Sequence, residues 1–130
     1  VKTKEAREWS GRVFNYLDDP AIQVELEKIR SAFDPKKHAL FVHLKAHYDP
    51  ARLFTKDGRL SGRAHDITNW EKPLIDLLFL PKYFNQKPPK GAPNLNVDDK
   101  YLIGCSSSKI PNKEIGIKIE IKILDLDRLF

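Results

Sequence analysis

The side chains best suited to chemistry lie in two acidic segments of the sequence. The first is HDITNWEKPLIDLL, from His65 to Leu78, and the second is NVDDKYLIG, which contains Asp98 and Asp99. Magnesium takes oxygen ligands and is usually held by one or two carboxylates together with a substrate phosphate. If the fold brings the two segments together, their carboxylates are the raw material for a magnesium site. The chemistry that they suggest is metal-dependent attack at a phosphate.

The first segment predicts a helix from about Asn69 to Leu80. At about 100° per residue, its apolar side chains fall on one stripe of that helix, formed by Trp70, Leu74, Leu77 and Leu78. The polar residues Asn69, Lys72 and Asp76 fall together on a roughly opposite stripe. The polar residues of this segment therefore converge instead of being scattered around the helix.

A proline, Pro73, bears on where this helix begins. A proline deep inside a helix removes a hydrogen bond, so the helix should start shortly before it. That start puts Asp66 and Thr68 at the mouth of the helix, where backbone N–H groups favour anions. The helix mouth is therefore a reasonable place for a site that binds a phosphate and its counterion.

Structural alternatives stay open for both segments. Thr68-x-x-Glu71 matches a capping box, and Lys72 with Asp76 forms an i,i+4 ion pair worth roughly a few tenths of a kcal/mol. An Asp98–Asp99 pair before a strand is also typical of a turn, or of charged residues that protect a sheet edge from pairing with another strand. On spacing alone, neither segment distinguishes a site from the ordinary start of a helix or a strand.

Composition narrows the classes of protein. A chain of 130 residues with 41% hydrophobic and 32% charged residues suits one folded domain over residues 1–130 and excludes a disordered chain. The longest apolar run, around Leu74–Leu80, is interrupted by Asp76 and is too short to span a bilayer, so no membrane contact is expected. The lone Cys105 cannot form an internal disulfide, which favours a reducing compartment. Its side chain is expected to be buried and to fill space in the core without a chemical role. The net charge of +5 suits a polyanionic partner such as nucleic acid.

Helices are expected before and between the strands that would position the two segments. One amphipathic helix is predicted over Thr3–Leu17. A second is predicted over Asp19–Phe33, with Asp19 as its N-cap and Pro20 at its first position.

Alternating apolar residues predict strands over residues 38–48 and 114–124, and residues 100–111 are expected to form a strand that runs into a turn. In the last of these, Ile115 to Ile123 are expected to share one face. Lys56-Asp57-Gly58 has the turn chemistry of a hairpin. His43 and His47 are spaced too widely along a strand for a zinc site and are expected to be exposed sheet residues. The expected fold class is α+β, a small, mostly antiparallel sheet packed with helices.

The two acidic segments resemble the RusA-type Holliday junction resolvases, the crossover junction endodeoxyribonucleases. The family pattern is Asp-x-Asp-Asn-x-x-Lys-x-x-x-Asp, followed by an Asp-Asp pair that opens a strand. DITNWEKPLID and VDDKYLIG match it at Asp66, Asn69, Lys72, Asp76, Asp98 and Asp99. The likeness extends over most of the chain, from TKEAREWSGRVF to the KIP before the last strand, but strict identity is confined to the motif positions.

The resemblance implies roles for these side chains. Asp66, Asp99 and Lys72 would be catalytic, and Lys72 would stabilise developing negative charge. Asp66 and Asp99 would hold Mg²⁺, for which Mn²⁺ can substitute, with Asp98 as a secondary ligand. Thr68, Asn69 and Asp76 would support the site: Asn69 would orient Asp66 or the phosphate, and Thr68 would reach the metal only through a water.

The resemblance also implies a dimeric endonuclease that resolves Holliday junctions or other branched DNA, without a small organic cofactor. Two basic loops would hold the DNA backbone without reading its sequence, through Arg52, Lys56, Arg59, Arg63, Lys82, Lys87 and Lys90. Because the family is common in phages and prophages, the expected location is the bacterial cytoplasm.

Three departures from the family pattern matter. Thr68 stands where the family has its second catalytic aspartate, so one negative charge is missing from the metal site. The family's N-terminal strand, with its Pro and Asn motif, does not occur in these residues, and the loop Pro81–Val97 is longer than expected. Two alternatives therefore stay open: a catalytically weakened or inactive RusA-like DNA-binding module, and a protein-interaction module that uses the Pro-rich loop.

Overall fold

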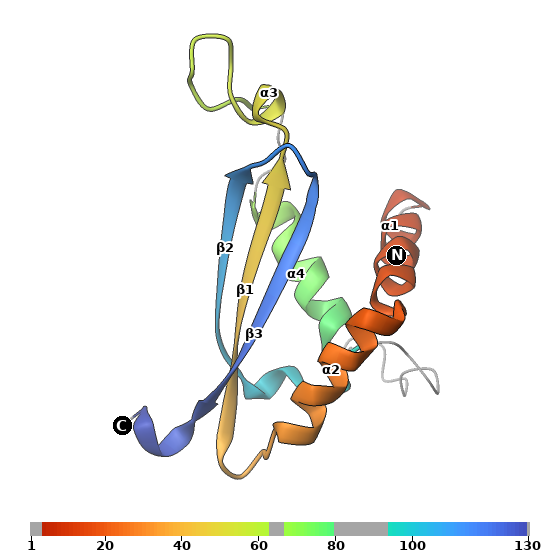
Figure 1. Ribbon diagram of the computed structural model, residues 1–130, viewed down its shortest axis with the longest axis vertical. Coiled ribbons are helices and arrows are strands. Elements are labelled where there is room, and N and C mark those ends of the chain that lie inside the picture. Colours follow the sequence, from red (N-terminus) through yellow and green to blue (C-terminus); the bar gives the residue numbers. More distant parts are fainter. Residues whose placement is uncertain (1–3, 63–66, 80–93, 130) are drawn as a thin grey trace.

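The architecture was analysed in a computed structural model that describes residues 4–62, 67–79 and 94–129, without the side chains of residues 6, 9, 10, 14 and 67–69 (Figure 1). The helices are α1 (Lys4–Leu17), α2 (Pro20–Ala32), α3 (Pro50–Leu53) and α4 (Ile67–Leu78). The strands are β1 (His38–Tyr48), β2 (Leu102–Pro111) and β3 (Gly116–Asp125). Short 3₁₀ turns, η2 (Asp99–Tyr101) and η3 (Leu126–Arg128), precede β2 and follow β3.

The strands form a three-stranded sheet in the order β2-β1-β3. This confirms the α+β class, but the sheet is mixed instead of mostly antiparallel, because β1 pairs in parallel with β2 and antiparallel with β3. The long connection from β1 through α4 allows the parallel pairing, which a short hairpin cannot make. Since β2 and β3 lie on either side of β1, the turn between them crosses the end of the central strand (Figure 1).

One face of the sheet carries the core. The inward side chains of β1 are buried, as its two-residue period predicts: Leu40, Val42, Leu44 and Ala46. They share the core with Leu17 of α1, Leu26 of α2 and Trp70 of α4. The opposite face of β1 is only partly buried, at Phe41, His43 and Lys45. Helices α1, α2 and α4 therefore cover one face and leave the other open among the described residues (Figure 1).

Helix α2 begins as the sequence predicts. The side chain of Asp19 accepts a hydrogen bond from the N–H of Ala21 at 2.9 Å, and Pro20 occupies the first turn. Leu26 is buried, and the predicted apolar face is completed by Ile22, Ile29 and Phe33, which pack against the core. The helix therefore closes one side of the core with the stripe expected from its period.

Helix α4 differs from the prediction at its start. It begins at Ile67, so Pro73 lies inside the helix instead of near its mouth. The proline can be accommodated because packing on the sheet stabilises the helix, although its ring removes one backbone hydrogen bond. Thr68 then lies within the first turn and is not the N-cap, and the side chain of Glu71 contacts β2. The predicted capping box also requires the side chain of Thr68, which lies outside the described side chains.

The segment after β1 contains the predicted hairpin. Helix α3 comes first, capped by the side chain of Asp49, which accepts from the N–H of Ala51 at 2.8 Å. An antiparallel bridge then joins Phe54 to Leu60 around Gly58, whose φ of 79° lies in the left-handed region that favours glycine. The sequence indicated the turn but not the helix.

Strand β3 also departs from the prediction at its start. Ile117, Ile119, Ile121 and Ile123 pack against the core as expected. Ile115, however, precedes the strand and is 75% exposed.

No helix within residues 4–62, 67–79 and 94–129 has the length and apolar character needed to cross a bilayer.

Candidate metal and nucleic-acid site

The acidic pair lies at the entrance to β2. Asp98 caps the turn η2, and its side chain accepts a hydrogen bond from the N–H of Lys100 at 2.9 Å. Asp99 is the first residue of that turn, and both carboxylates are partly buried. The N–H of Tyr101 donates to the carbonyl of Asp98 at 3.2 Å. This local network fixes the carboxylate of Asp98 and the backbone of the pair directly before the strand, where the sequence predicts them.

A buried clamp, which the sequence did not reveal, fixes the segment before the acidic pair. Asn94 is 1% exposed; its amide donates to the carbonyl of Phe79 at 3.3 Å and accepts from the N–H of Asn96 at 3.0 Å. The N–H of Leu95 donates to the carbonyl of Leu78 at 2.8 Å. Arg30 of α2 donates to the carbonyls of Asn94 at 2.9 Å and of Leu95 at 3.3 Å. These bonds tie the approach to Asp98 to the end of α4 and to α2.

The first acidic segment is described only in part. Asp66 lies outside the described residues, and Thr68 and Asn69 belong to α4 but their side chains are also outside them. Lys72 is exposed and Asp76 is partly buried. On the apolar stripe, Trp70, Leu74, Leu77 and Leu78 are all buried, as predicted. The stripe that carries Asn69, Lys72 and Asp76 therefore lies away from the core.

Contacts at both ends of α4 fix its direction relative to β2. Leu78, at the helix end, bonds to Leu95 on the approach to the acidic pair. Nearer the helix start, the carboxylate of Glu71 accepts a hydrogen bond from the hydroxyl of Ser107. Ser107 lies about 16 Å along β2 from its first residue, at the usual rise of a strand. Helix α4 therefore runs antiparallel to β2, and the start of the helix lies at the end of the sheet opposite the start of β2 (Figure 1).

The separation is large compared with the reach of a metal ion. The helix from Ile67 to Leu78 is about 16 Å long at the usual rise per residue. Oxygen ligands of magnesium lie at about 2.0–2.1 Å from the ion. The start of α4 and the acidic pair of the same chain are therefore not adjacent, and the sequence motif does not translate into one compact cluster within the described part of a single chain.

The fit of a magnesium ion depends on the available donors. The carboxylates of Asp98 and Asp99 are hard oxygen donors of the kind that Mg²⁺ prefers. Across residues 4–62, 67–79 and 94–129, however, no group of three or more His, Cys, Asp or Glu side chains is arranged to hold a metal ion. The described residues of one chain thus offer two oxygen donors of a suitable kind at Asp98 and Asp99 but do not by themselves form a complete magnesium site.

A second polar cluster lies between α4 and β2, at Glu71, Cys105 and Ser107. Cys105 is partly buried rather than fully buried as expected, and it packs against the core two residues before Ser107. Burial raises the pKa of the Cys105 thiol, and the nearby carboxylate of Glu71 raises that pKa further, while a hydrogen bond with Ser107 opposes the change. A raised pKa leaves little thiolate at neutral pH, so the cysteine is a poor nucleophile.

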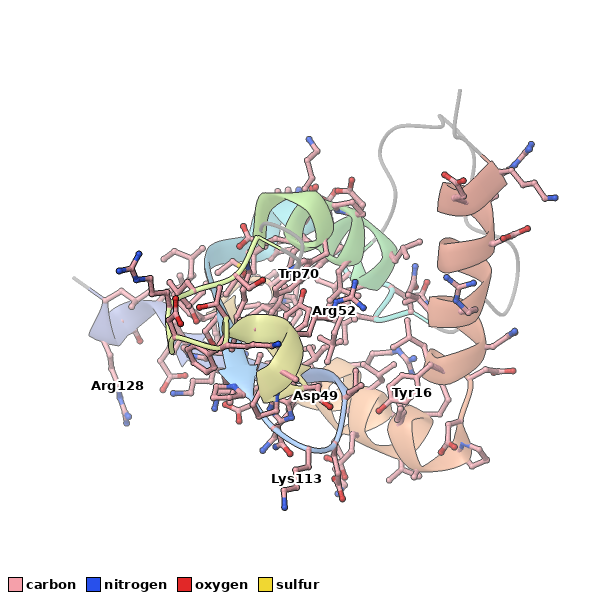
Figure 2. All side chains as sticks on the ribbon, turned by 90° about the horizontal axis from the view of Figure 1, so that it is seen from above. Tyr16, Asp49, Arg52, Trp70, Lys113 and Arg128 are labelled. Carbon is pink, nitrogen blue, oxygen red and sulfur yellow. The ribbon has the colours of Figure 1, made fainter. Side chains whose placement is uncertain are left out.

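Basic residues on two loops are predicted to hold DNA, and the structure describes most of those on the first loop. Arg52 of α3 and Lys56 and Arg59 of the hairpin are exposed beyond the end of β1 (Figure 1; Arg52 is also labelled in Figure 2). Arg63, Lys82, Lys87 and Lys90 lie outside the described residues. The exposed basic hairpin and the start of α4 lie at the same end of the sheet (Figure 1).

The residues predicted from the motif thus form two groups. Those of the first segment are spread along α4, whose start lies at the same end of the sheet as the basic hairpin and whose last turn carries Asp76, whereas Asp98 and Asp99 lie at the entrance to β2 (Figure 1). No family model, curated protein or solved structure matches the chain.

Proposed function

We propose that this protein is a RusA-like, magnesium-dependent endonuclease that acts on branched DNA as a homodimer. The observation that carries the proposal is the acidic pair of Asp98 and Asp99, which is held at the entrance to β2. The same chain presents the spacing Asp66, Asn69, Lys72 and Asp76 along α4 and the residue before it. The net charge of +5 and the exposed hairpin cations support a polyanionic partner.

The metal site is assembled from two copies of the chain. Asp66 is covalently next to Ile67, which begins α4 at the far end of the sheet from Asp99. On this proposal a single chain does not supply both groups to one ion, because the described start of α4 is far from Asp99, and a two-fold dimer brings the helix start of one copy to the acidic pair of the other. Such a dimer contains two equivalent sites because its interface is self-complementary. Two sites suit a substrate that must be cut in two strands.

Each residue then has a task that its chemistry allows. A bound magnesium would acidify a water and act as a Lewis acid on the phosphate. Asp66 of one copy and Asp98 and Asp99 of the other would provide the oxygen ligands. Lys72 is exposed on the outward stripe of α4, where its ammonium can hold the scissile phosphate. Thr68 is a weaker ligand than the aspartate of the family pattern, so we expect slow turnover.

A second candidate is a RusA-like module that binds branched DNA without cutting it. It is favoured by Thr68 at a catalytic position and by the separation of the two acidic groups within one chain. Both candidates use the basic hairpin to hold the DNA backbone, so binding alone does not distinguish them.

The test is cleavage of a synthetic four-way junction with Mg²⁺ or Mn²⁺. We expect cuts from the wild type that disappear in Asp66→Asn and in Asp99→Asn, while both variants still bind the junction. Glu25→Gln, an exposed change on α2, is the matched control and should cut like the wild type. If the wild type binds the junction without cutting it, the second candidate is supported. If the two Asp variants lose junction binding as well as cleavage, the roles assigned to these aspartates are contradicted.

A further inference from the structure

The open face of the sheet carries an ordered array of side chains that the proposed nuclease site does not use. The register places Gly104, Phe41 and Lys122 in one row across β2, β1 and β3. The next rows are Ser106, His43 and Glu120, and then Ser108, Lys45 and Lys118. All belong to the face opposite the core, because the neighbouring residues of each strand point to the helices. Among the described residues, no helix covers this array (Figure 1).

An aromatic platform occupies the first rows. Phe41 lies over Gly104 so closely that a Cβ at that position would come within 2.5 Å of the ring atom Cε2. The rings of Phe41 and His43 are neighbours, with centroids 4.7 Å apart and planes inclined by 43°. The imidazole of His43 is held in turn by the hydroxyl of Ser106, with Nδ1 and Oγ 2.5 Å apart. The Phe41 ring is thus positioned by Gly104 and His43, and the residue stays partly exposed on the open face.

Charge on the same face favours an anion. The array contains three lysines, Lys45, Lys118 and Lys122, and one acid, Glu120, which leaves an excess of two positive charges. Glu120 accepts from Lys45 at 3.3 Å and lies 3.5 Å from Lys118. The hydrogen bond and the charge of Lys45 are the main reasons why the pKa of Glu120 is lowered. Lys122 is exposed and stands in the row of the aromatic platform.

We propose that the open face binds an unpaired strand of DNA, with a base stacked on Phe41 and a phosphate near Lys122. Base stacking on aromatic rings beside a basic surface is the usual chemistry of single-strand recognition. A duplex keeps its bases paired and offers no free ring face to Phe41, so the aromatic platform selects an unpaired strand. Ser106 and Ser108 add exposed hydroxyls on the same surface. The choice of DNA rests on the proposed function, since branched DNA contains the strand exchange point at which bases can unpair.

The position of this platform suits that substrate. Gly104 lies two residues into β2 from Leu102, so Phe41 and Asp99 lie at the same end of the sheet. A strand held on the open face would therefore approach the end of the sheet that carries the acidic pair. The basic hairpin lies at the opposite end and would contact the DNA backbone elsewhere (Figure 1).

The experiment measures binding of a fluorescent oligothymidylate and of a duplex of equal length, each at two salt concentrations. We expect Phe41→Leu, which keeps an apolar side chain over Gly104, to weaken binding of the single strand by about tenfold or more and to leave duplex binding unchanged. Phe41→Trp should retain tight binding of the single strand. Lys122→Gln should reduce the salt dependence of single-strand binding by about 0.7 in the logarithmic slope, the value for one phosphate contact.

A matched control removes a lysine that does not belong to the array. Lys28 is exposed on α2, with 68% of its side chain accessible, and Lys28→Gln should change neither affinity nor slope. Unchanged single-strand binding in Phe41→Leu, or an equal loss for duplex and single strand, would overturn the proposal. A change of oligomeric state in Phe41→Leu with unaltered DNA binding would also overturn it and would assign the face to a second copy of the chain.

The outcome can be separated from that of the proposed nuclease function. Junction cleavage by a protein that does not bind the oligothymidylate would leave the nuclease proposal standing and reject the platform. Single-strand binding that depends on Phe41, in a protein that neither binds nor cuts junctions, would support the platform and reject the nuclease proposal.

Discussion

Glu71 of α4 accepts a hydrogen bond from the hydroxyl of Ser107 of β2, and together with the bond from Leu95 to Leu78 at the helix end this contact sets the helix antiparallel to the strand. The start of α4 is thereby held at the end of the sheet opposite Asp99, which opens β2. Two acidic segments that look like one site in the sequence are consequently separated within a chain. This separation is the reason why the proposed metal site requires two copies.

The carboxylate of Glu71 should also control the reactivity of Cys105. Burial and then the charge of Glu71 raise the pKa of the thiol, so Glu71→Gln should lower that pKa. The alkylation rate of Cys105 by iodoacetamide at pH 8 should then increase, and its pH profile should move to lower pH. Glu25→Gln on α2 is the control, because Glu25 is an exposed partner of Lys28. An unchanged pH profile in Glu71→Gln would contradict the assigned cause.

Asn94 should be a major determinant of stability. Its buried amide bonds to Phe79 and Asn96, so Asn94→Ala leaves backbone groups without a partner and should cost about 1–3 kcal/mol of the free energy of unfolding. Urea denaturation measures this change. Asn15→Ala, on the exposed side of α1, should change stability little. Equal stabilities of the two variants would show that the clamp before Asp98 does not stabilise the fold.

Gly104 should be energetically coupled to Phe41. An added Cβ would meet the ring at 2.5 Å, so the ring must move in Gly104→Ala, at a cost of about 1–3 kcal/mol. In a Phe41→Ala background the same substitution should cost much less, and the difference is the coupling energy of a double-mutant cycle. Gly11→Ala is the control, since no atom lies within 4 Å of a Cβ placed there. Additive effects of the two substitutions would mean that the ring does not rest on the glycine.

Thr68→Asp should increase junction cleavage. The change adds a carboxylate within the first turn of α4, where the family pattern has its second catalytic aspartate. An anion is also favoured at a helix start, so the fold should tolerate it. Cleavage rates at fixed magnesium concentration, with circular dichroism to check folding, measure the effect. A folded variant with the wild-type rate would place residue 68 outside the metal site.

Local patterns in the sequence predicted local structure well. The two-residue period of β1 and the Asp19-Pro20 start of α2 are set by neighbouring residues, and both predictions are confirmed. The parallel pairing of β1 with β2 is not set locally, because it depends on how a long connection packs. The same holds for Pro73, whose place inside α4 is compatible with the fold only through packing on the sheet.

The candidate site was predictable in its residue types and not in its geometry. The spacing around Asp98 and Asp99 correctly indicated carboxylates at a strand entrance. The direction of α4, which separates them from the helix start, depends on the contact between Glu71 and Ser107 and on the bond between Leu78 and Leu95, and no sequence pattern connects either pair. The clamp at Asn94 likewise depends on Arg30 of a distant helix.

The most direct test of the two-copy site mixes two inactive variants. Asp66→Asn and Asp99→Asn dimers should each be inactive, because every site in them lacks one ligand. After subunit exchange, half of the dimers contain both variants, and each of these has one intact site, so about a quarter of the wild-type number of sites should cut. Recovery of junction cleavage on mixing is the result predicted here. If the wild type cuts the junction but neither variant cuts it, alone or after subunit exchange, the two aspartates act within one chain and the two-copy site is contradicted.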